Sequence, residues 1–170
     1  MKKSLLLIAI LAFVGTAAAV AQPRAVGVNL GTGNGISYQH SLGETNMLDV
    51  AVNVPLQLGG ESVGFGIGGI VTYDWINPFG TAIPWEYQGQ WNWYLGVGGS
   101  AGAYGIFSKE APNYWYAGVA GHVGVEYQFW FPLQLSLDIR PTFGLDNTKD
   151  KVDFGLAGLY NVSIGVRYLF

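Results

Sequence analysis

Apolar and polar side chains alternate with a period of two along most of the chain, and this pattern limits the fold more than any other feature. The last stretch is the clearest example. Every second residue from Tyr160 to Phe170 is apolar or aromatic, and the residues between them are mostly small or polar. Such alternation is typical of β-strands whose two faces meet different surroundings. No helical period competes with it after Gln22, so we expect an all-β chain.

Turn sequences divide the alternating stretches into eight expected strands. Glycine next to asparagine or glutamate marks hairpins, because Gly and Asn tolerate the backbone angles of tight turns. We expect inner-side turns at 43–46, 77–87 and 131–132, and outer-side loops at 32–34, 58–61, 108–113 and 146–153. The expected strands are 24–31, 35–42, 46–57, 62–76, 88–107, 114–131, 133–145 and 154–170. Eight antiparallel strands without an internal linker predict a single up-and-down β-barrel domain.

The N-terminus has the organisation of a secretory signal peptide. Lys2 and Lys3 precede an apolar run, and Ala19-Val20-Ala21 fits the small-residue cleavage pattern. The alternative is a transmembrane helix over residues 5–21, but this segment is at the lower limit of length and no positive cluster follows it. We therefore expect residues 1–21 to be a cleaved signal peptide and residues 22–170 to be one barrel domain.

Composition helps to choose between a soluble and a membrane barrel, because alternation is the same in both. A soluble sandwich or lipocalin-like barrel would turn its polar face to water, whereas a membrane barrel turns its apolar face to lipid. Charged residues make up only 11% of this chain, against about 25% in a typical soluble domain. Aromatic residues reach 15% and gather towards strand ends, as they do in interfacial girdles. They include Tyr73, Trp75, Trp91, Trp93, Trp115, Tyr116, Phe129, Trp130, Phe131, Tyr168 and Phe170. We therefore expect a transmembrane barrel.

The C-terminal stretch from Val162 to Phe170 resembles the assembly signal of bacterial outer-membrane barrels, with Tyr168 and the final Phe170 as its aromatic residues. The segments 35–40 and 135–141 are also similar to that group. The chain from residue 22 onwards resembles the small eight-stranded OmpA/OmpX-type outer-membrane barrels of Gram-negative bacteria. That resemblance implies passage with periplasmic chaperones, insertion by the barrel-assembly machinery, and contact with outer-membrane lipid and lipopolysaccharide. We expect a monomer.

Alternation also predicts which charged side chains point into the barrel. An eight-stranded barrel has an interior just wide enough to be filled by side chains, and buried charges there should pair. We expect Arg140 and Arg167 to bridge several carboxylates in a lumen network that acts as a structural plug. A gate whose ion pairs switch to open a small pore is the alternative. The expected network comprises Asp49, Asp74, His122, Glu126, Asp138, Arg140 and Arg167.

Several classes of function are disfavoured by the sequence. The chain has no cysteine, so disulfides and thiolate metal sites are excluded, and two histidines make another metal site unpromising. The net charge of -3 offers no basic surface for nucleic acid. His40 and Ser41 are neighbours and would point to opposite faces of a strand, and His122 and Glu126 are four residues apart on one strand. The glycine-rich segment 96–102 lacks the helix that follows a phosphate-binding loop.

We therefore expect no catalytic residue, no metal and no cofactor. The expected function is that of an integral outer-membrane protein with a structural or interaction role and a filled lumen. The alternatives are a narrow pore for ions or small solutes, a lipid A-modifying outer-membrane enzyme, and a periplasmic β-sandwich binding protein.

Overall fold

The structure is a computed structural model that describes residues 22–170 apart from 33, 55, 60–61, 81–87, 105–113, 149–150 and 158–160. The expected signal peptide over residues 1–21 and the expected outer loop at 108–113 lie outside the described residues. The strands are β1 (Gln22–Gly31), β2 (Gly35–Ser41), β3 (Asn46–Asn53), β4 (Leu56–Gly59), β5 (Ser62–Pro78), β6 (Gly89–Tyr104), β7 (Tyr114–Phe129), β8 (Leu133–Arg140), β9 (Thr142–Thr148), β10 (Lys151–Leu156) and β11 (Asn161–Leu169). No helix in the described part of the chain is long and apolar enough to cross a membrane.

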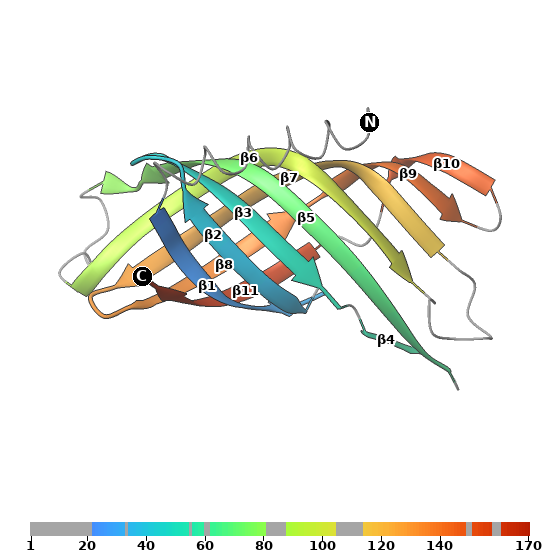
Figure 1. The fold of residues 1–170 in the computed structure, drawn as a ribbon, viewed down its shortest axis with the longest axis horizontal. Coiled ribbons are helices and arrows are strands. Elements are labelled where there is room, and N and C mark those ends of the chain that lie inside the picture. The colour runs from blue at the N-terminus through green and yellow to red at the C-terminus, as the bar shows by residue number, and fades with distance from the viewer. Residues whose placement is uncertain are drawn as a thin grey trace, which may run out of the picture.

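These strands close into an antiparallel barrel (Figure 1). Its wall has eight strand positions, which we call walls, because three positions are each occupied by two consecutive strands. Each strand pairs with its neighbours, and closure occurs where β1 pairs with β11, which in turn pairs with β8. Three walls consist of two strands in line: β3 with β4, β8 with β9, and β10 with β11. The expected all-β, eight-stranded antiparallel barrel is confirmed.

The expected strand boundaries differ from the structure at these three walls. The expected single strand 133–145 is interrupted at Pro141, between β8 and β9. Proline has no backbone N–H to donate to a ladder, but its carbonyl still accepts a hydrogen bond from Gly121 N at 2.8 Å. The expected strands 46–57 and 154–170 are likewise divided into β3 with β4 and β10 with β11.

Both ends of the barrel sequence lie at one rim, which we call the inner end. Ala25 of β1 faces Leu169 of β11 in the register, and Phe170 N donates to the Arg24 carbonyl at 3.2 Å. The short turns at 42–45 and 130–132 lie at the same rim, and Gly43 has the positive φ of 115° that favours glycine there. At the opposite rim, the outer end, the β1–β2 turn includes Asn34, whose side chain accepts from Gly31 N.

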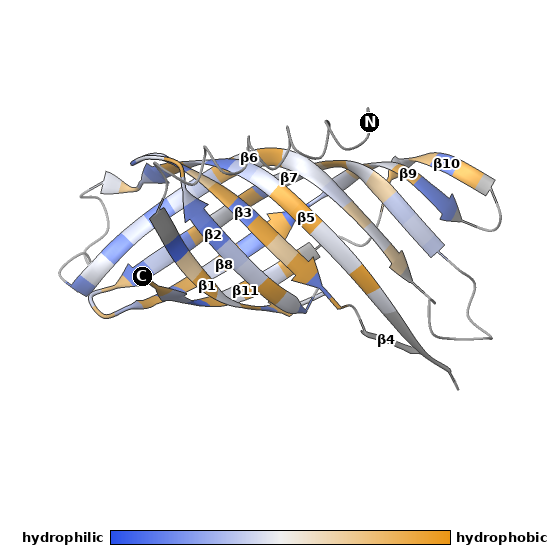
Figure 2. Ribbon diagram, viewed as in Figure 1, coloured by the Kyte–Doolittle hydropathy of each residue, from blue (hydrophilic) through white to orange (hydrophobic). Residues whose placement is uncertain are grey.

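Buried side chains of the barrel are mainly polar and its exposed strand side chains are mainly apolar, the reverse of a typical water-soluble protein. Figure 2 shows the corresponding change between hydrophilic and hydrophobic residues along the strands. Most of its fully buried large side chains are charged or amides, whereas its exposed side chains include many Val, Leu, Ile and aromatic residues. Along β8, for example, Gln134, Ser136 and Asp138 are buried while Leu135 and Leu137 are exposed. Among the described strand residues that face outward, none is Asp, Glu, Lys or Arg.

Candidate functional site in the barrel interior

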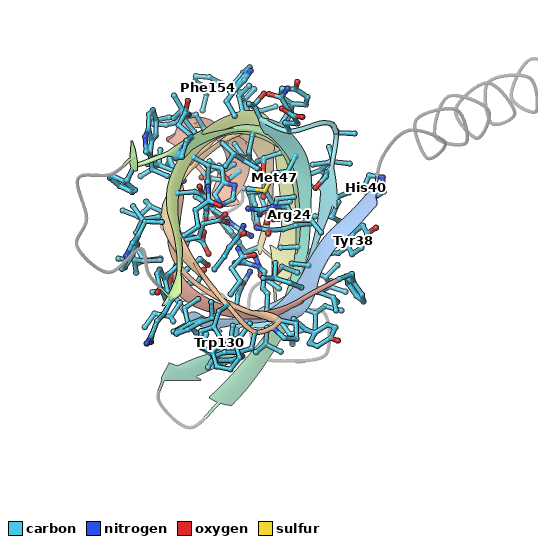
Figure 3. The ribbon with its side chains drawn as sticks, turned by 90° about the vertical axis from the view of Figure 1, so that its left-hand side faces the viewer. Arg24, Tyr38, His40, Met47, Trp130 and Phe154 are labelled. Carbon is cyan, nitrogen blue, oxygen red and sulfur yellow. The ribbon has the colours of Figure 1, made fainter. Side chains whose placement is uncertain are left out.

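The barrel interior is the candidate functional site, because alternation directs all the expected network residues into it. Each of the seven is at most 1% exposed. They come from β3, β5, β7, β8 and β11, so they converge from most of the wall. The view along the barrel shows side chains projecting into the lumen, with Arg24 and Met47 inside and Tyr38, His40, Trp130 and Phe154 outside (Figure 3). The seven residues are Asp49, Asp74, His122, Glu126, Asp138, Arg140 and Arg167.

Six of these residues form one continuous chain of close polar contacts, which we call the central cluster: Asp74, His122, Asp138, Arg167, Asp49 and Arg140. His122 lies between two carboxylates, with Nδ1 2.9 Å from Asp74 Oδ1 and Nε2 3.4 Å from Asp138 Oδ1. The Nη2 atom of Arg167 is 3.3 Å from Asp138 Oδ2 and 4.0 Å from Asp49 Oδ2. Arg140 Nη2 completes the chain, 3.1 Å from Asp49 Oδ1.

Arg167 connects the walls of the barrel through neutral partners as well. Its Nε donates to Ser37 Oγ on β2 at 2.8 Å, and its Nη1 donates to Ser136 Oγ on β8 at 2.5 Å. Its Nη2 also donates to Asn29 Oδ1 on β1 at 3.0 Å. Arg167 itself belongs to β11, so a single guanidinium links four consecutive walls. The planar fork of an arginine suits such divergent acceptors.

Arg140 differs from Arg167 in how its guanidinium is satisfied. Its only described ionic contact is with Asp49, and its Nε, Nη1 and Nη2 have no hydrogen-bond partner of good geometry in the described part of the protein. Arg167 is therefore the more fully bonded of the two arginines that were expected to bridge carboxylates.

Tyr94 of β6 also contacts the central cluster. Its hydroxyl contacts Asp138 Oδ1, and its ring centroid lies 4.8 Å from that of His122. The ring fits because Gly124 on β7 has no side chain: a Cβ built there would be 2.5 Å from Tyr94. Glycine at this inward position therefore makes room for an aromatic ring in the narrow lumen.

Glu126 belongs to a second group near the inner end, which a hydrogen bond from Gln39 Nε2 to Asp49 Oδ2 at 3.1 Å links to the central cluster. Its carboxylate is paired with both guanidinium Nη atoms of Arg24, and Gln134 Nε2 donates to it at 2.7 Å. We call Arg24, Gln39, Asn92, Glu126, Gln128 and Gln134 the inner cluster. A cavity of about 350 Å³ at the inner rim reaches Arg24.

Sequence reasoning missed Arg24. Simple alternation would place it on the outer face with Val26 and Val28. The register between β1 and β2 shifts between Pro23 and Ala25, however, so Arg24 occupies a β-bulge. A bulge re-aims side chains, and here it turns the guanidinium into the lumen. The only signal for this in the sequence was an arginine on an otherwise uncharged outer face.

The outer half of the lumen is less charged. Ala51, Ile70 and Ala120 form a small buried apolar group there. Tyr116, expected in an interfacial girdle, instead points inward and is 8% exposed. Its ring lies over Gly102, where a built Cβ would be 2.5 Å from the ring. Buried side chains therefore enter the described lumen at its inner, central and outer levels.

The residues weighed for catalysis lie apart from one another. His40 is on the outer surface, where its Nδ1 is 2.8 Å from Tyr38 Oη. His122 is inside the barrel in contact with Asp74 and Asp138. The described residues hold no group of three or more His, Cys, Asp or Glu arranged to bind a metal ion. Tyr168 and Phe170 of the expected assembly signal are 56% and 68% exposed, with their ring centroids 5.5 Å apart.

Comparisons with protein-family models, with curated proteins and with solved structures found no match to this chain. The structure by itself defines the class, a closed eight-stranded antiparallel β-barrel whose interior is lined by polar and charged side chains.

Proposed function

We propose that this protein is an integral outer-membrane β-barrel with a structural or interaction role, whose lumen is closed by side chains. The observation that carries the proposal is the uncharged, apolar outer wall around a charged interior. Exposed Val28, Val119 and Ile164, at 43%, 60% and 55%, are typical of this wall. Covering it with lipid removes apolar area from water, at about 25 cal/mol per Å², while the charges stay paired inside.

The dimensions of the wall are consistent with a membrane. The outward positions of β6 run from Trp91 to Ala101. Ten residues at about 3.4 Å each, tilted by about 40°, extend about 26 Å along the barrel axis, close to the ~25 Å apolar band of membrane barrels. Aromatic residues encircle the inner end of this band, as an interfacial girdle would. This girdle comprises Tyr38, Tyr73, Trp75, Trp91, Trp93, Tyr127, Phe129, Trp130, Phe131, Tyr168 and Phe170.

The remaining parts of the proposal concern location and partners. A cleaved signal over residues 1–21 would export the chain, and Tyr168 with Phe170 would present it to the barrel-assembly machinery. Outer-membrane lipid and lipopolysaccharide would then surround a monomeric barrel. The proposal includes no catalytic step, because the two histidines lie on opposite faces of the wall.

Gel migration of protein from isolated membranes tests membrane integration. A folded membrane barrel should stay in the membrane pellet after alkaline extraction, and its migration in detergent gels should change on boiling. Recovery of the folded protein in the aqueous phase would contradict the proposal and favour a soluble barrel.

Planar-bilayer recordings test the plug separately. The central and inner clusters fill the lumen, so we expect no steady conductance from the refolded protein. A steady ohmic current through single inserted barrels would show a pore instead, even if membrane integration were confirmed.

A further inference from the structure

We propose that the cavity at the inner rim binds a small molecule that carries a primary ammonium group on a short alkyl chain. This cavity, which we call the inner vestibule, has a volume of about 350 Å³ and is lined by the turn at 42–45 and by the inner ends of β1, β2, β5, β6 and β7. Its volume is at the lower end of the range of ligand pockets. The inference goes beyond the proposed function and does not depend on whether lipid surrounds the barrel.

Arg24 lines the inner vestibule, but its charge is compensated inside the barrel. Its Nη1 donates to Gln39 Oε1 at 2.7 Å and to Glu126 Oε2 at 3.1 Å, and its Nη2 pairs with the other carboxylate oxygen of Glu126. Figure 3 looks onto the inner end and shows Arg24 within the ring of strands. The guanidinium therefore adds little net positive charge to the vestibule.

Glu126 also fixes the orientation of the side-chain amides that line the inner vestibule. A carboxylate paired with a guanidinium only accepts hydrogen bonds, so the amide nitrogens of Asn92 and Gln128 face it, each at 2.9 Å. Gln90 Nε2 donates in turn to Asn92 Oδ1 at 3.1 Å. These bonds use the amide nitrogens of Gln90 and Gln128. They leave the two carbonyl oxygens of these residues available to a ligand.

Glu44 gives the inner vestibule a negative charge. It lines the vestibule from the exposed turn at 42–45, and no Lys, Arg or His of the described chain lies within 4.0 Å of its carboxylate. Arg24 and Glu126 cancel each other, so Glu44 leaves a net charge of minus one. The hydroxyls of Ser41 and Thr45 also line the vestibule and can accept hydrogen bonds. The vestibule therefore offers mainly acceptors, one of them charged.

A primary ammonium group matches this set of acceptors, because it carries one positive charge and three N–H donors. Ile76 and Pro78 line the same vestibule and offer an apolar surface to an alkyl chain. A carboxylate ligand would be repelled by Glu44, and a neutral alcohol would leave its charge uncompensated. The turn leaves space for entry, since a Cβ built on Gly43 would meet nothing within 4 Å.

Titration of the refolded protein with n-butylammonium chloride in zwitterionic detergent micelles tests the site. Sodium butyrate and n-butanol are controls with a similar chain and with a negative charge or none. We expect butylammonium to shift the amide NMR signals of Glu44, Gln90 and Gln128 saturably, with a dissociation constant in about the millimolar range for so small a ligand. Butanol should cause weaker shifts and butyrate none. Equal binding of butyrate, or no saturable shift with butylammonium, would overturn the inference.

A series of charge variants locates the binding. Glu44→Gln removes the unpaired carboxylate and should weaken butylammonium binding about fivefold. Gln90→Lys places an ammonium group of the protein in the vestibule and should abolish binding. Asp153→Asn is the matched control, because it removes an exposed carboxylate at the outer end, and it should leave binding unchanged. Equal weakening by Glu44→Gln and Asp153→Asn would indicate unspecific attraction to the negative protein and refute the site.

The two proposals fail separately. Saturable butylammonium binding to a barrel that does not stay in membranes would refute only the membrane proposal. A barrel that resists alkaline extraction but binds no butylammonium would refute only the ligand site. Glu44 and Gln90 are exposed, so their variants should refold. If one does not, the three titrations of the wild type still decide the question.

Discussion

Arg167 forms hydrogen bonds with residues on several different strands in the lumen. Its donors contact Asn29, Ser37, Ser136 and Asp138, on three strands other than its own. Each of these acceptors is buried, and a buried acceptor that loses its donor costs about 1–3 kcal/mol. The arginine thus satisfies several groups that the barrel has removed from water.

Replacing Arg167 should therefore destabilise the barrel strongly. We expect Arg167→Met to lower the free energy of unfolding by about 3–5 kcal/mol, because it leaves Asp138 buried without its guanidinium. The free energy of unfolding of Arg167→Lys should lie between those of the wild type and Arg167→Met, because one ammonium group cannot reproduce the planar fork of the guanidinium. The outward Ile164→Val on the same strand is the matched control, with a cost of about 0.5–1.5 kcal/mol at most. Urea titration in lipid vesicles measures all three. Equal midpoints for Arg167→Met and the control would refute this role.

Inward glycines make a second residue-scale prediction. In Gly124→Ala the new methyl group would be 2.5 Å from the Tyr94 ring, so Tyr94 must move away from Asp138. Overpacking of this kind costs about 1–3 kcal/mol. Gly69 on β5 faces outward with nothing within 4 Å of a built Cβ, and Gly69→Ala should be neutral or slightly stabilising. Thermal shifts of the gel-migration transition compare the two. Equal losses would show that the lumen position has no special constraint.

Alternation predicts that the seven residues of the expected network enter the lumen, but it does not predict which of them contact one another. Asp49, Asp138 and Arg167 follow the period of two and lie inside. Partner choice depends on the height of each residue along the barrel axis, which follows from strand register and tilt. For this reason Glu126 meets Arg24 rather than Arg140. Arg24 itself escaped prediction because a bulge breaks the period on which the prediction relied.

At the scale of elements, the eight walls could be predicted because turn residues separate every alternating stretch. The breaks that divide three of these walls into two strands each could not be predicted from the sequence. Pro141 interrupts β8 and β9 without reversing the two faces, since Arg140 and Thr142 are both buried. Because every second residue still faces inward on both sides of Pro141, the alternation in the sequence does not reveal where one strand ends and the next begins.

The closure between β1 and β11 gives a prediction for a chain that has no cysteine of its own. Val28 and Val166 are register partners, so V28C/V166C should form a disulfide on mild oxidation. Val71 lies on β5, three strands from β1, about 14 Å away at about 4.8 Å per strand. V28C/V71C should therefore not crosslink, because bridged Cα atoms must be within about 7 Å. Gel migration of boiled samples with and without reductant separates the outcomes. A crosslink in the control pair alone would refute the register.

For the whole molecule, the cost of a charge on the outer wall should depend on its depth. Val97 lies in the middle of the outward face of β6, whereas Trp130 lies in a turn at the inner rim. We expect Val97→Arg to cost about 2–4 kcal/mol in lipid vesicles and Trp130→Arg about 0–1 kcal/mol. Urea titration of both variants in vesicles provides the measurement. In a soluble barrel both positions would face water, and an equal, small effect of the two charges would contradict a membrane location.

The pairing of β1 with β11 also has a consequence for the time at which the barrel can form. Arg167 and its partner Asn29 are 138 residues apart in sequence, and Arg24 and Glu126 are 102 apart. Contacts of such long range raise the contact order and slow folding, because a large loop must close before they contribute. The first strand to be synthesised must therefore wait for the last. Until β11 is available to pair with β1, the apolar residues of β1 are not part of a closed barrel. The growing chain therefore needs protection from aggregation during this time.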